Sequence, residues 1–248
     1  MPSNRPSPDP QHRRILHGRR LGRPLRKRQQ NLLETLLPTL EVNTQVGNAG
    51  ENPVQLDLNQ VFPDHRPKLW LEIGFGGGEH LLSQAQAHPD VGIIGCEPFL
   101  NGVAKLLAGI DRCRQAGSSL SNIRIFRGDG RQLLEILPTQ SLDRAFLLFP
   151  DPWPKTRHHK RRFIQTDSVD QFARLLKNGS ELRIATDHPD YCRWALLHMV
   201  SHPAFEWLAE GPEDWRQRPT DWPETRYEAK AAAAGRQRYY LRFRRLPR

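Results

Sequence analysis

The sequence predicts an α/β fold built on a mostly parallel, doubly wound sheet, with an antiparallel strand pair at the C-terminal end. From Lys68 onward, short apolar runs alternate with segments in which apolar residues recur at helical spacing. The run Leu142–Phe149 is strongly apolar, as expected of a strand buried on both faces. A chain of 248 residues is long enough to bury one substantial core of this kind.

The expected strands are short apolar runs that end at glycine, proline or acidic residues. They span Leu69–Ile73, Val91–Cys96, Ile123–Phe126, Leu142–Phe149 and Leu182–Ala185, with the antiparallel pair at Phe205–Leu208 and Tyr239–Phe243. Helices are expected between them, at Glu79–Ala87, Asn101–Ala116 and Gln132–Leu137, ahead of Leu182, and at Tyr191–Val200. The pattern for the second of these helices consists of Val103, Leu106, Leu107 and Ile110.

Three parts of the chain are expected to differ in organisation. Residues 1–28 form a basic arm that is largely disordered, since prolines and arginines dominate it. Residues 29–67 hold a short helix, whose leucines recur from Leu32 to Leu37 before Pro38, and then a connecting region with turn residues. The main domain spans residues 68–248.

Positive charge is concentrated in separate segments. The net charge is +10, yet residues 1–28 hold nine Lys/Arg against one acid, residues 155–162 hold five and residues 236–248 hold six, both without an acid. The remainder of the chain is therefore net acidic. This segregation is typical of a protein that binds a polyanion, and the alternative is a solvated tail with chance clustering.

The three cysteines, at positions 96, 113 and 192, lie far apart and form no CxxC pair. Zinc and disulfide scaffolds are therefore not expected, and neither is a metal site at His158 and His159, which lack partners at suitable spacing. No apolar run approaches the roughly 20 residues of a membrane span, and the N-terminus lacks the apolar stretch of a secretory signal. We expect a cytoplasmic protein without membrane contact.

A glycine-rich turn follows the first expected strand. The segment reads WLEIGFGGGE, with Glu72 in the strand and Gly74, Gly76 and Gly78 in the turn. Glycine permits a sharp turn and close approach of a ligand. The G-x-G-x-x-G pattern of dinucleotide folds fails here, because its third glycine is replaced by Glu79, which would repel a pyrophosphate.

Acids also end the next two strands. Glu97 stands where a carboxylate can accept both ribose hydroxyls, and Asp129 where one can receive an adenine amino group. A ligand without phosphate and with a cationic amino-acid portion tolerates such acids, and S-adenosylmethionine is one. The alternative is a tight turn flanked by surface charges.

The fourth strand runs into the segment FPDPWPKTRHHKRRF, in which Asp151 is the one acid. Its prolines fix φ and stiffen the loop around this residue. Asp151 is either a catalytic-site carboxylate or the partner of Lys155 or Arg157 in a simple ion pair. Trp153 would either stack on a base or fill the core.

These residues together resemble the bacterial tRNA (guanine-N7-)-methyltransferases. The resemblance runs from about Arg13 to the C-terminus and is most specific at Asp151-Pro-Trp-Pro-Lys155-x-Arg157-His158-x-Lys160-Arg161-Arg162. Thr186-Asp187 with Tyr191, and Thr225-Arg226-Tyr227-Glu228, are similar to two further family signatures. The chain departs from the family at Tyr239-Tyr240, where many members carry Trp-Asp, and at Ala231–Ala234, where members often have Arg-Gly.

The resemblance implies a Rossmann-like class I methyltransferase fold and methyl transfer from S-adenosylmethionine to N7 of a tRNA guanosine in the variable loop. It implies cofactor binding by Glu72, Gly74, Gly76, Glu97, Asp129 and Asp151. Asp151 would be the catalytic-site acid, and the substrate would be held by Lys155, Asp187, Thr225, Arg226, Tyr227 and Glu228. RNA would be contacted by Arg157, His158, His159, Lys160, Arg161 and Arg162.

The chemistry of guanine agrees with such a role for a carboxylate. N7 carries a lone pair and no proton, so the task is positioning and charge stabilisation and not proton abstraction. Asp151 or Asp187 could accept from N1–H and the 2-amino group of the base. The rival interpretations are a nucleotide-dependent oxidoreductase, and a noncatalytic RNA-binding protein with a methyltransferase fold.

Overall fold

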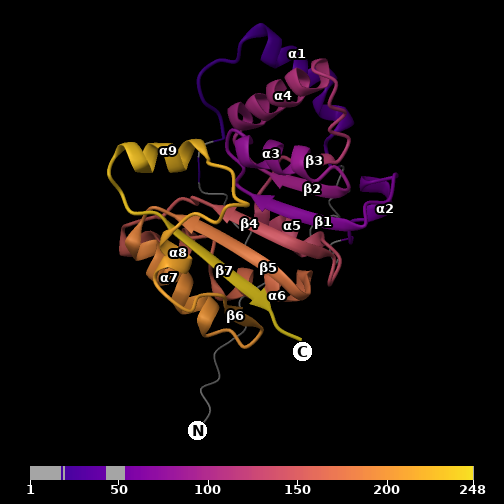
Figure 1. Cartoon of the computed structure of the whole chain (residues 1–248). Coiled ribbons are helices and arrows are strands. Elements are labelled where there is room, and N and C mark those ends of the chain that lie inside the picture. Colours follow the sequence, from indigo (N-terminus) through magenta and orange to yellow (C-terminus); the bar gives the residue numbers. More distant parts are fainter. Residues whose placement is uncertain (1–17, 19, 43–53, 248) are drawn as a thin grey trace.

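A seven-stranded sheet forms the centre of the molecule (Figure 1). The computed structural model describes residues 18, 20–42 and 54–247. Within them the strand order is β3-β2-β1-β4-β5-β7-β6. The strands are β1 Lys68–Ile73, β2 Val91–Cys96, β3 Ile123–Phe126, β4 Leu142–Leu148, β5 Leu176–Thr186, β6 Phe205–Trp207 and β7 Tyr239–Arg245.

The first five strands run parallel, and β7 pairs antiparallel with both β5 and β6. The prediction of a mostly parallel sheet with a C-terminal antiparallel pair is therefore confirmed. Because the chain order reverses on either side of β1, the loops after β1 and β4 leave neighbouring strands at the same edge, which is where open α/β sheets bind ligands.

Two hydrophobic cores lie on opposite faces of the sheet. One contains Leu81 and Leu107 of helices α3 (Glu79–Ala87) and α4 (Leu100–Gln115). The other contains Leu133, Phe172 and Tyr191 of the helices that cover the second face. Those helices are α5 Gly130–Ile136, α6 Thr166–Leu175 and α7 Pro189–Val200. Strand β1 contributes Trp70 to the first core and its neighbours in sequence to the second, so it is buried on both sides.

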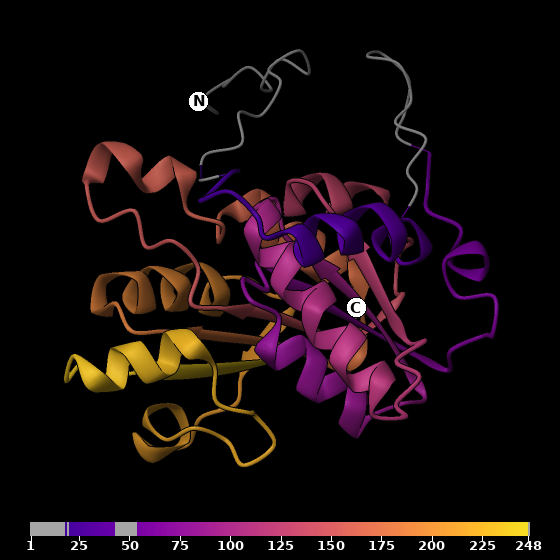
Figure 2. The same ribbon diagram turned by 90° about the horizontal axis from the view of Figure 1, so that it is seen from above.

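The segment ahead of the sheet packs on α4. Helix α1 (Lys27–Thr35) lies beside α4 in both views (Figures 1 and 2), and its Leu32 belongs to the same core as Leu107. A 3₁₀ turn at Leu37–Thr39 follows, and then the four-residue helix α2 (Leu58–Val61) precedes β1. Residues 1–17 and 19 of the expected arm lie outside the described residues, and the proposed domain boundaries at 28 and 67 stay predictions.

Several elements differ from the sequence-based expectation. Strand β5 begins at Leu176, six residues before the expected start, because the polar residues 177–181 continue it. Thr156–Arg161 form a 3₁₀ helix, η2, inside the basic segment. The last third also contains two helices that the sequence analysis did not predict, α8 Glu213–Arg216 and α9 Arg226–Ala233. In the described residues, no helix combines the length and apolar character needed to cross a bilayer.

Candidate active site

A cavity of about 420 Å³ opens where β1 to β4 end. Glu97, Asp129 and Asp151 all line it, together with Gly74 and Gly76. Three separate motifs of the sequence, together with the family resemblance, predict these residues as parts of one site. The parallel sheet brings them together because the strands that carry them end at one edge.

The loop after β1 (residues 74–78, the glycine loop) is built from left-handed backbone. Gly74, Gly76 and Gly78 have φ values of +74°, +57° and +79°, which residues with a Cβ rarely adopt. A Cβ on Gly76 would also lie 2.9 Å from the ring of Tyr227, and one on Gly78 would meet Leu106 at 2.7 Å. The conformation therefore favours glycine at all three positions, and the available space also favours it at Gly76 and Gly78.

Gly102 of α4 completes this loop, and the sequence analysis did not identify it. A Cβ at this position would lie 2.2 Å from the carbonyl oxygen of Gly76. Helix α4 can approach the glycine loop only because this residue has no side chain. An isolated glycine inside an otherwise regular helical pattern is the signal that could have revealed the contact.

Glu97 holds the glycine loop by its carboxylate. Oε2 accepts a hydrogen bond from the Gly76 N–H at 2.7 Å, and Oε1 accepts one from the Phe99 N–H at 2.9 Å. Burial raises the pKa of Glu97, these two N–H groups oppose the rise, and the nearby charge of Asp151 adds to it. Each carboxylate oxygen retains a second lone pair for a ligand hydroxyl.

Asp129 and Glu72 have different surroundings. Asp129 is buried at the start of α5, where its Oδ1 accepts from the Arg131 N–H at 3.0 Å while the residue still lines the cavity. Glu72 is 3% exposed on β1, and its Oε2 is 2.7 Å from Nδ1 of His80. Because Glu72 is not part of the cavity wall, its predicted contact with a cofactor stays a prediction.

The loop after β4 (residues 149–155, the proline loop) carries Asp151 into the cavity. Its backbone has left-handed φ values at Phe149 (+50°) and Trp153 (+43°), although neither is glycine. Asp151 is exposed, and no hydrogen bond or ion pair joins its carboxylate to any described residue. The alternative that Asp151 forms an ion pair with Lys155 or Arg157 is therefore not seen among the described residues. Trp153 is half-buried at the cavity wall.

Arg162 holds the proline loop from behind. It is 0% exposed; its Nε donates to the Pro152 carbonyl at 2.9 Å, and its Nη2 donates to the carboxylate of Asp190. The guanidinium also lies over the ring of Trp194, 5.0 Å from its centroid, and lowers the pKa of Asp190. The prediction that Arg162 contacts RNA is therefore wrong for this conformation, because the side chain is enclosed by the protein.

The other residues of the basic segment lie at or near the surface. Arg157, Lys160 and Lys155 are exposed, and Arg161 lies over the ring of Trp153, 5.1 Å from its centroid. The ring of His158 packs edge-on against Trp153, and that of His159 against Trp194, so both histidines are half-buried. Among the described residues, no cluster of histidine, cysteine or acidic side chains could hold a metal ion.

The predicted substrate segment caps and begins α9. Thr225 Oγ1 accepts from the Glu228 N–H at 3.1 Å, and Tyr227 reaches the cavity beside Gly76. Glu228 is buried, and it accepts from the Tyr240 hydroxyl and pairs with Arg218. The Tyr239-Tyr240 departure thus supplies a hydroxyl that holds α9 in place.

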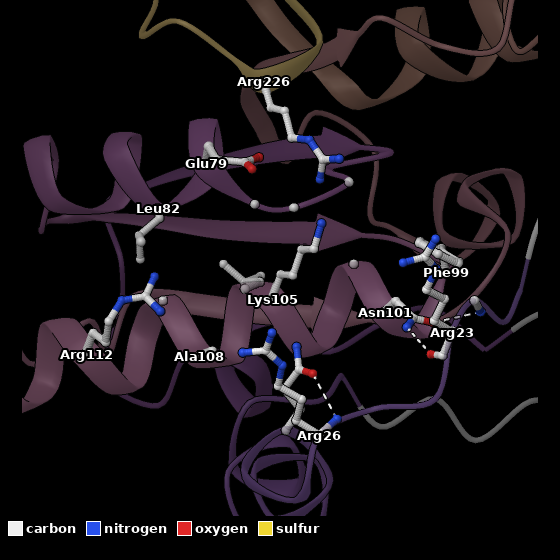
Figure 3. Close-up of a pocket in the computed structure, with 18 of the residues that line it drawn as sticks. Arg23, Arg26, Glu79, Leu82, Phe99, Asn101, Lys105, Ala108, Arg112 and Arg226 are labelled. Atoms are coloured by element: carbon white, nitrogen blue, oxygen red, sulfur yellow. Dashed lines mark hydrogen bonds between the residues drawn. The ribbon is translucent and has the colours of Figure 1, made fainter. Parts of the chain in front are cut away.

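Two further predicted substrate residues complete the set. Asp187 follows β5 and pairs with Arg236 at 2.7 Å. Arg226 is exposed and lines a second cavity (Figure 3), which shares Gly76, Phe99 and Tyr227 with the first.

Solved structures with the same fold are methyltransferases. The 16S rRNA methyltransferase KamB superposes with a TM-score of 0.55 at 13% identity and covers 82% of this chain and 99% of its own. An antibiotic-related methyltransferase superposes with a TM-score of 0.51 at 19% identity, over 77% of this chain and 94% of its own. At these identities the similarity establishes the fold alone.

Sequence comparisons are more specific. A family described as putative methyltransferase matches residues 66–241. A tRNA (guanine-N(7)-)-methyltransferase of Rhodospirillum rubrum is 54% identical over 94% of this chain and 88% of its own length. The enzyme of that name from Zymomonas mobilis is 50% identical over 96% of this chain and 97% of its own. The chain therefore belongs to the bacterial tRNA (guanine-N7-)-methyltransferase family.

Proposed function

We propose that this protein transfers a methyl group from S-adenosylmethionine to N7 of a guanosine in tRNA, in the variable loop. The observation that carries the proposal is the convergence of Glu97, Asp129 and Asp151 on one cavity beside the glycine loop. Family membership at about half identity over nearly the whole chain supports the same reaction. It gives no support to the oxidoreductase or to the noncatalytic alternative.

The cavity residues fit the cofactor. S-adenosylmethionine would supply an electrophilic methyl group on a sulfonium sulfur. Glu97 would accept the ribose hydroxyls with its remaining lone pairs, and Asp129 would receive the adenine amino group. The cavity of about 420 Å³ falls within the range of roughly 300–1,000 Å³ that small-molecule sites occupy.

Asp151 would orient the base and stabilise charge. Its carboxylate has no partner among the described residues, so both oxygens are available to N1–H and the 2-amino group of guanine. Methylation at N7 leaves the base positively charged, and a nearby anion lowers the energy of that developing charge. Since N7 carries no proton, Asp151 acts without removing one.

The exposed cations next to the cavity would bind the tRNA. Arg157, Lys160 and Arg161 lie on η2, beside the loop that carries Asp151. Each phosphate that such a side chain neutralises releases counterions, so tRNA affinity should fall steeply with salt. The target guanine would be turned out of its stack to reach the cavity.

Nucleoside mass spectrometry tests the proposal directly. Unmodified tRNA is incubated with the protein and S-adenosylmethionine, then digested; we expect 7-methylguanosine with wild-type protein and almost none with Asp151→Asn. Methylation of another base or position would contradict the assignment. Absence of any methylated nucleoside, with tRNA still bound, would favour the noncatalytic alternative, and tight binding of NADH in place of the methyl donor would favour the oxidoreductase.

A further inference from the structure

A second and larger cavity adjoins the first on the other side of the glycine loop. It measures about 950 Å³ and is bounded by residues 22–29, the outer surface of α4 and the start of α9. Gly76, Phe99 and Tyr227 line both cavities. We call this second cavity the α4 groove; Glu97, Asp129 and Asp151, which line the first cavity, are not among its lining residues.

Cationic side chains dominate the walls of the α4 groove. They are Arg23, Arg26, Arg28, Lys105, Arg112 and Arg226, against the single acid Glu79. Of the six, Arg28 forms an ion pair with a described residue, Asp111 at 2.6 Å, and the others form none within the described part of the chain. Among the described residues, the cations that line the groove therefore outnumber the acids beside them.

These cations come from distant parts of the sequence (Figure 3). Lys105 and Arg112 lie seven residues apart on α4, which places them about two helical turns, or roughly 10 Å, apart along one face. Figure 3 shows Lys105 and Arg226 pointing toward one another from opposite walls. Charges spread along an open groove suit a chain of phosphates better than a single small anion.

The wall of the groove is held in place before any ligand binds. The Asn101 side chain donates to the Arg23 carbonyl and accepts from the Gly22 N–H, both at 2.7 Å. The Leu100 N–H donates to the Arg20 carbonyl at 3.0 Å. Because this clamp fixes residues 20–23 against α4, little ordering entropy would be lost when an anion binds.

We propose that the α4 groove binds the sugar–phosphate backbone of the tRNA outside the target nucleotide. This inference rests on the proposed function, since a guanine in the first cavity fixes where the RNA enters. Arg161 of η2 lines the first cavity, and Gly76, Phe99 and Tyr227 line both the first cavity and the α4 groove. The basic segment on η2 and the α4 groove therefore flank the target base, so the RNA backbone meets positive charge on both sides of it.

The test compares two double variants of the full-length protein. Lys105→Ala with Arg112→Ala removes two exposed charges from the groove, and Lys68→Ala with Lys177→Ala removes two charges from the opposite, amino-terminal edge of the sheet. We expect the groove variant to bind unmodified tRNA about tenfold more weakly, with a salt dependence shallower by roughly 1–2 in log–log slope. The control variant should match wild type in both, and KM for tRNA should rise more than kcat falls in the groove variant.

Cofactor binding separates a local disturbance from the proposed effect. Calorimetric affinity for S-adenosylmethionine should stay at the wild-type value in both double variants. If the groove variant loses affinity for S-adenosylmethionine, Lys105→Arg with Arg112→Lys becomes the deciding variant, because it keeps both positive charges. Weak tRNA binding by this charge-conserving variant would overturn the proposal.

The proposal would also be overturned if both the alanine variant and Lys105→Glu with Arg112→Glu bound tRNA with unchanged affinity and an unchanged salt slope. If wild-type protein methylates guanine N7 while the groove variants bind normally, the groove inference alone fails. If the groove variants weaken tRNA binding but wild-type protein forms no 7-methylguanosine, the proposed function fails and the groove stands.

Discussion

The glycine loop and the proline loop border the same cavity but owe their shapes to different parts of the chain. Gly74, Gly76 and Gly78 take left-handed backbone without strain, and Glu97 accepts a hydrogen bond from the Gly76 N–H. Phe149 and Trp153 take similar φ values with side chains present, which costs about 1–3 kcal/mol each. The proline loop is therefore held in a conformation that its own residues do not favour.

The groups that impose this conformation come from elsewhere. Arg162 donates to the carbonyl of Pro152, and Asp190 at the start of α7 fixes Arg162 in turn. The glycine loop should keep its conformation when a distant contact is lost, because its own residues favour that conformation. The proline loop should not, because contacts from outside the loop impose its conformation.

The largest effect is expected at Asp151. Asp151→Asn keeps the size of the side chain and removes its charge, so transition-state stabilisation should fall by about 3–4 kcal/mol, or roughly 10²–10³-fold in kcat. Single-turnover methylation with saturating tRNA measures this rate. Affinity for tRNA should change little, and a near-normal rate would show that the proline loop carries no catalytic charge.

Arg162→Ala should reduce both stability and turnover. The side chain is fully buried, and its loss leaves the Pro152 carbonyl without its partner, at a cost of about 1–3 kcal/mol. Thermal unfolding measures this loss, and kcat should fall more than KM rises because Asp151 is no longer held.

Arg161→Ala is the matched control for Arg162→Ala. Arg161 is the preceding residue in the sequence, and its guanidinium lies over Trp153 at the cavity rim. Its stability should stay near wild type, while its tRNA affinity weakens. Should the two variants behave alike in unfolding and in tRNA binding, Arg162 would have no positioning role.

Gly102→Ala tests the glycine loop from the side of α4. The added Cβ would lie 2.2 Å from the Gly76 carbonyl oxygen, so we expect a cost of about 1–3 kcal/mol and weaker cofactor binding. Gly109→Ala in the same helix meets the flexible end of Leu82 at 3.0 Å and should be neutral or slightly stabilising. Equal effects of the two substitutions on cofactor affinity would exclude the proposed contact.

The smallest effect is a pH dependence from Glu97. Its pKa is raised chiefly by burial, and acceptance of two ribose hydroxyls favours the ionised form. The affinity for the cofactor should therefore be highest at pH values above the raised pKa of Glu97, and it should fall as the pH decreases through that pKa. In Glu97→Gln the affinity for the cofactor should be lower and nearly independent of pH, as measured by calorimetry between pH 5 and pH 8. If this variant keeps the pH dependence of the wild type, the assignment to Glu97 is refuted.

The sequence predicted the glycine side of the site well. Left-handed glycines and acids at strand ends are local signals, and parallel strands bring such ends together without further information. The positions of the core strands along the chain and the C-terminal antiparallel pair followed from the same apolar periodicity, whereas the order of the strands within the sheet was not predicted.

The proline side was predicted less well, because its determinants are not local. Nothing in a run of cations distinguishes the buried Arg162 from the exposed Lys160, since the difference arises from the packing of Asp190 and Trp194 around one of them. Helix α9 was missed because its anchor, Glu228, binds Tyr240 and Arg218, which lie outside the helix. The α4 groove likewise combines cations from three segments, two of which carry no basic run.

A crystal structure with S-adenosylhomocysteine tests the central claim that the two loops form a single site. We predict the ribose hydroxyls on Glu97, the adenine near Asp129, and the Asp151 carboxylate on the side of the sulfur atom that faces open solvent. An adenosyl group bound in the α4 groove, or Asp151 turned out of the cavity in the complex, would contradict it.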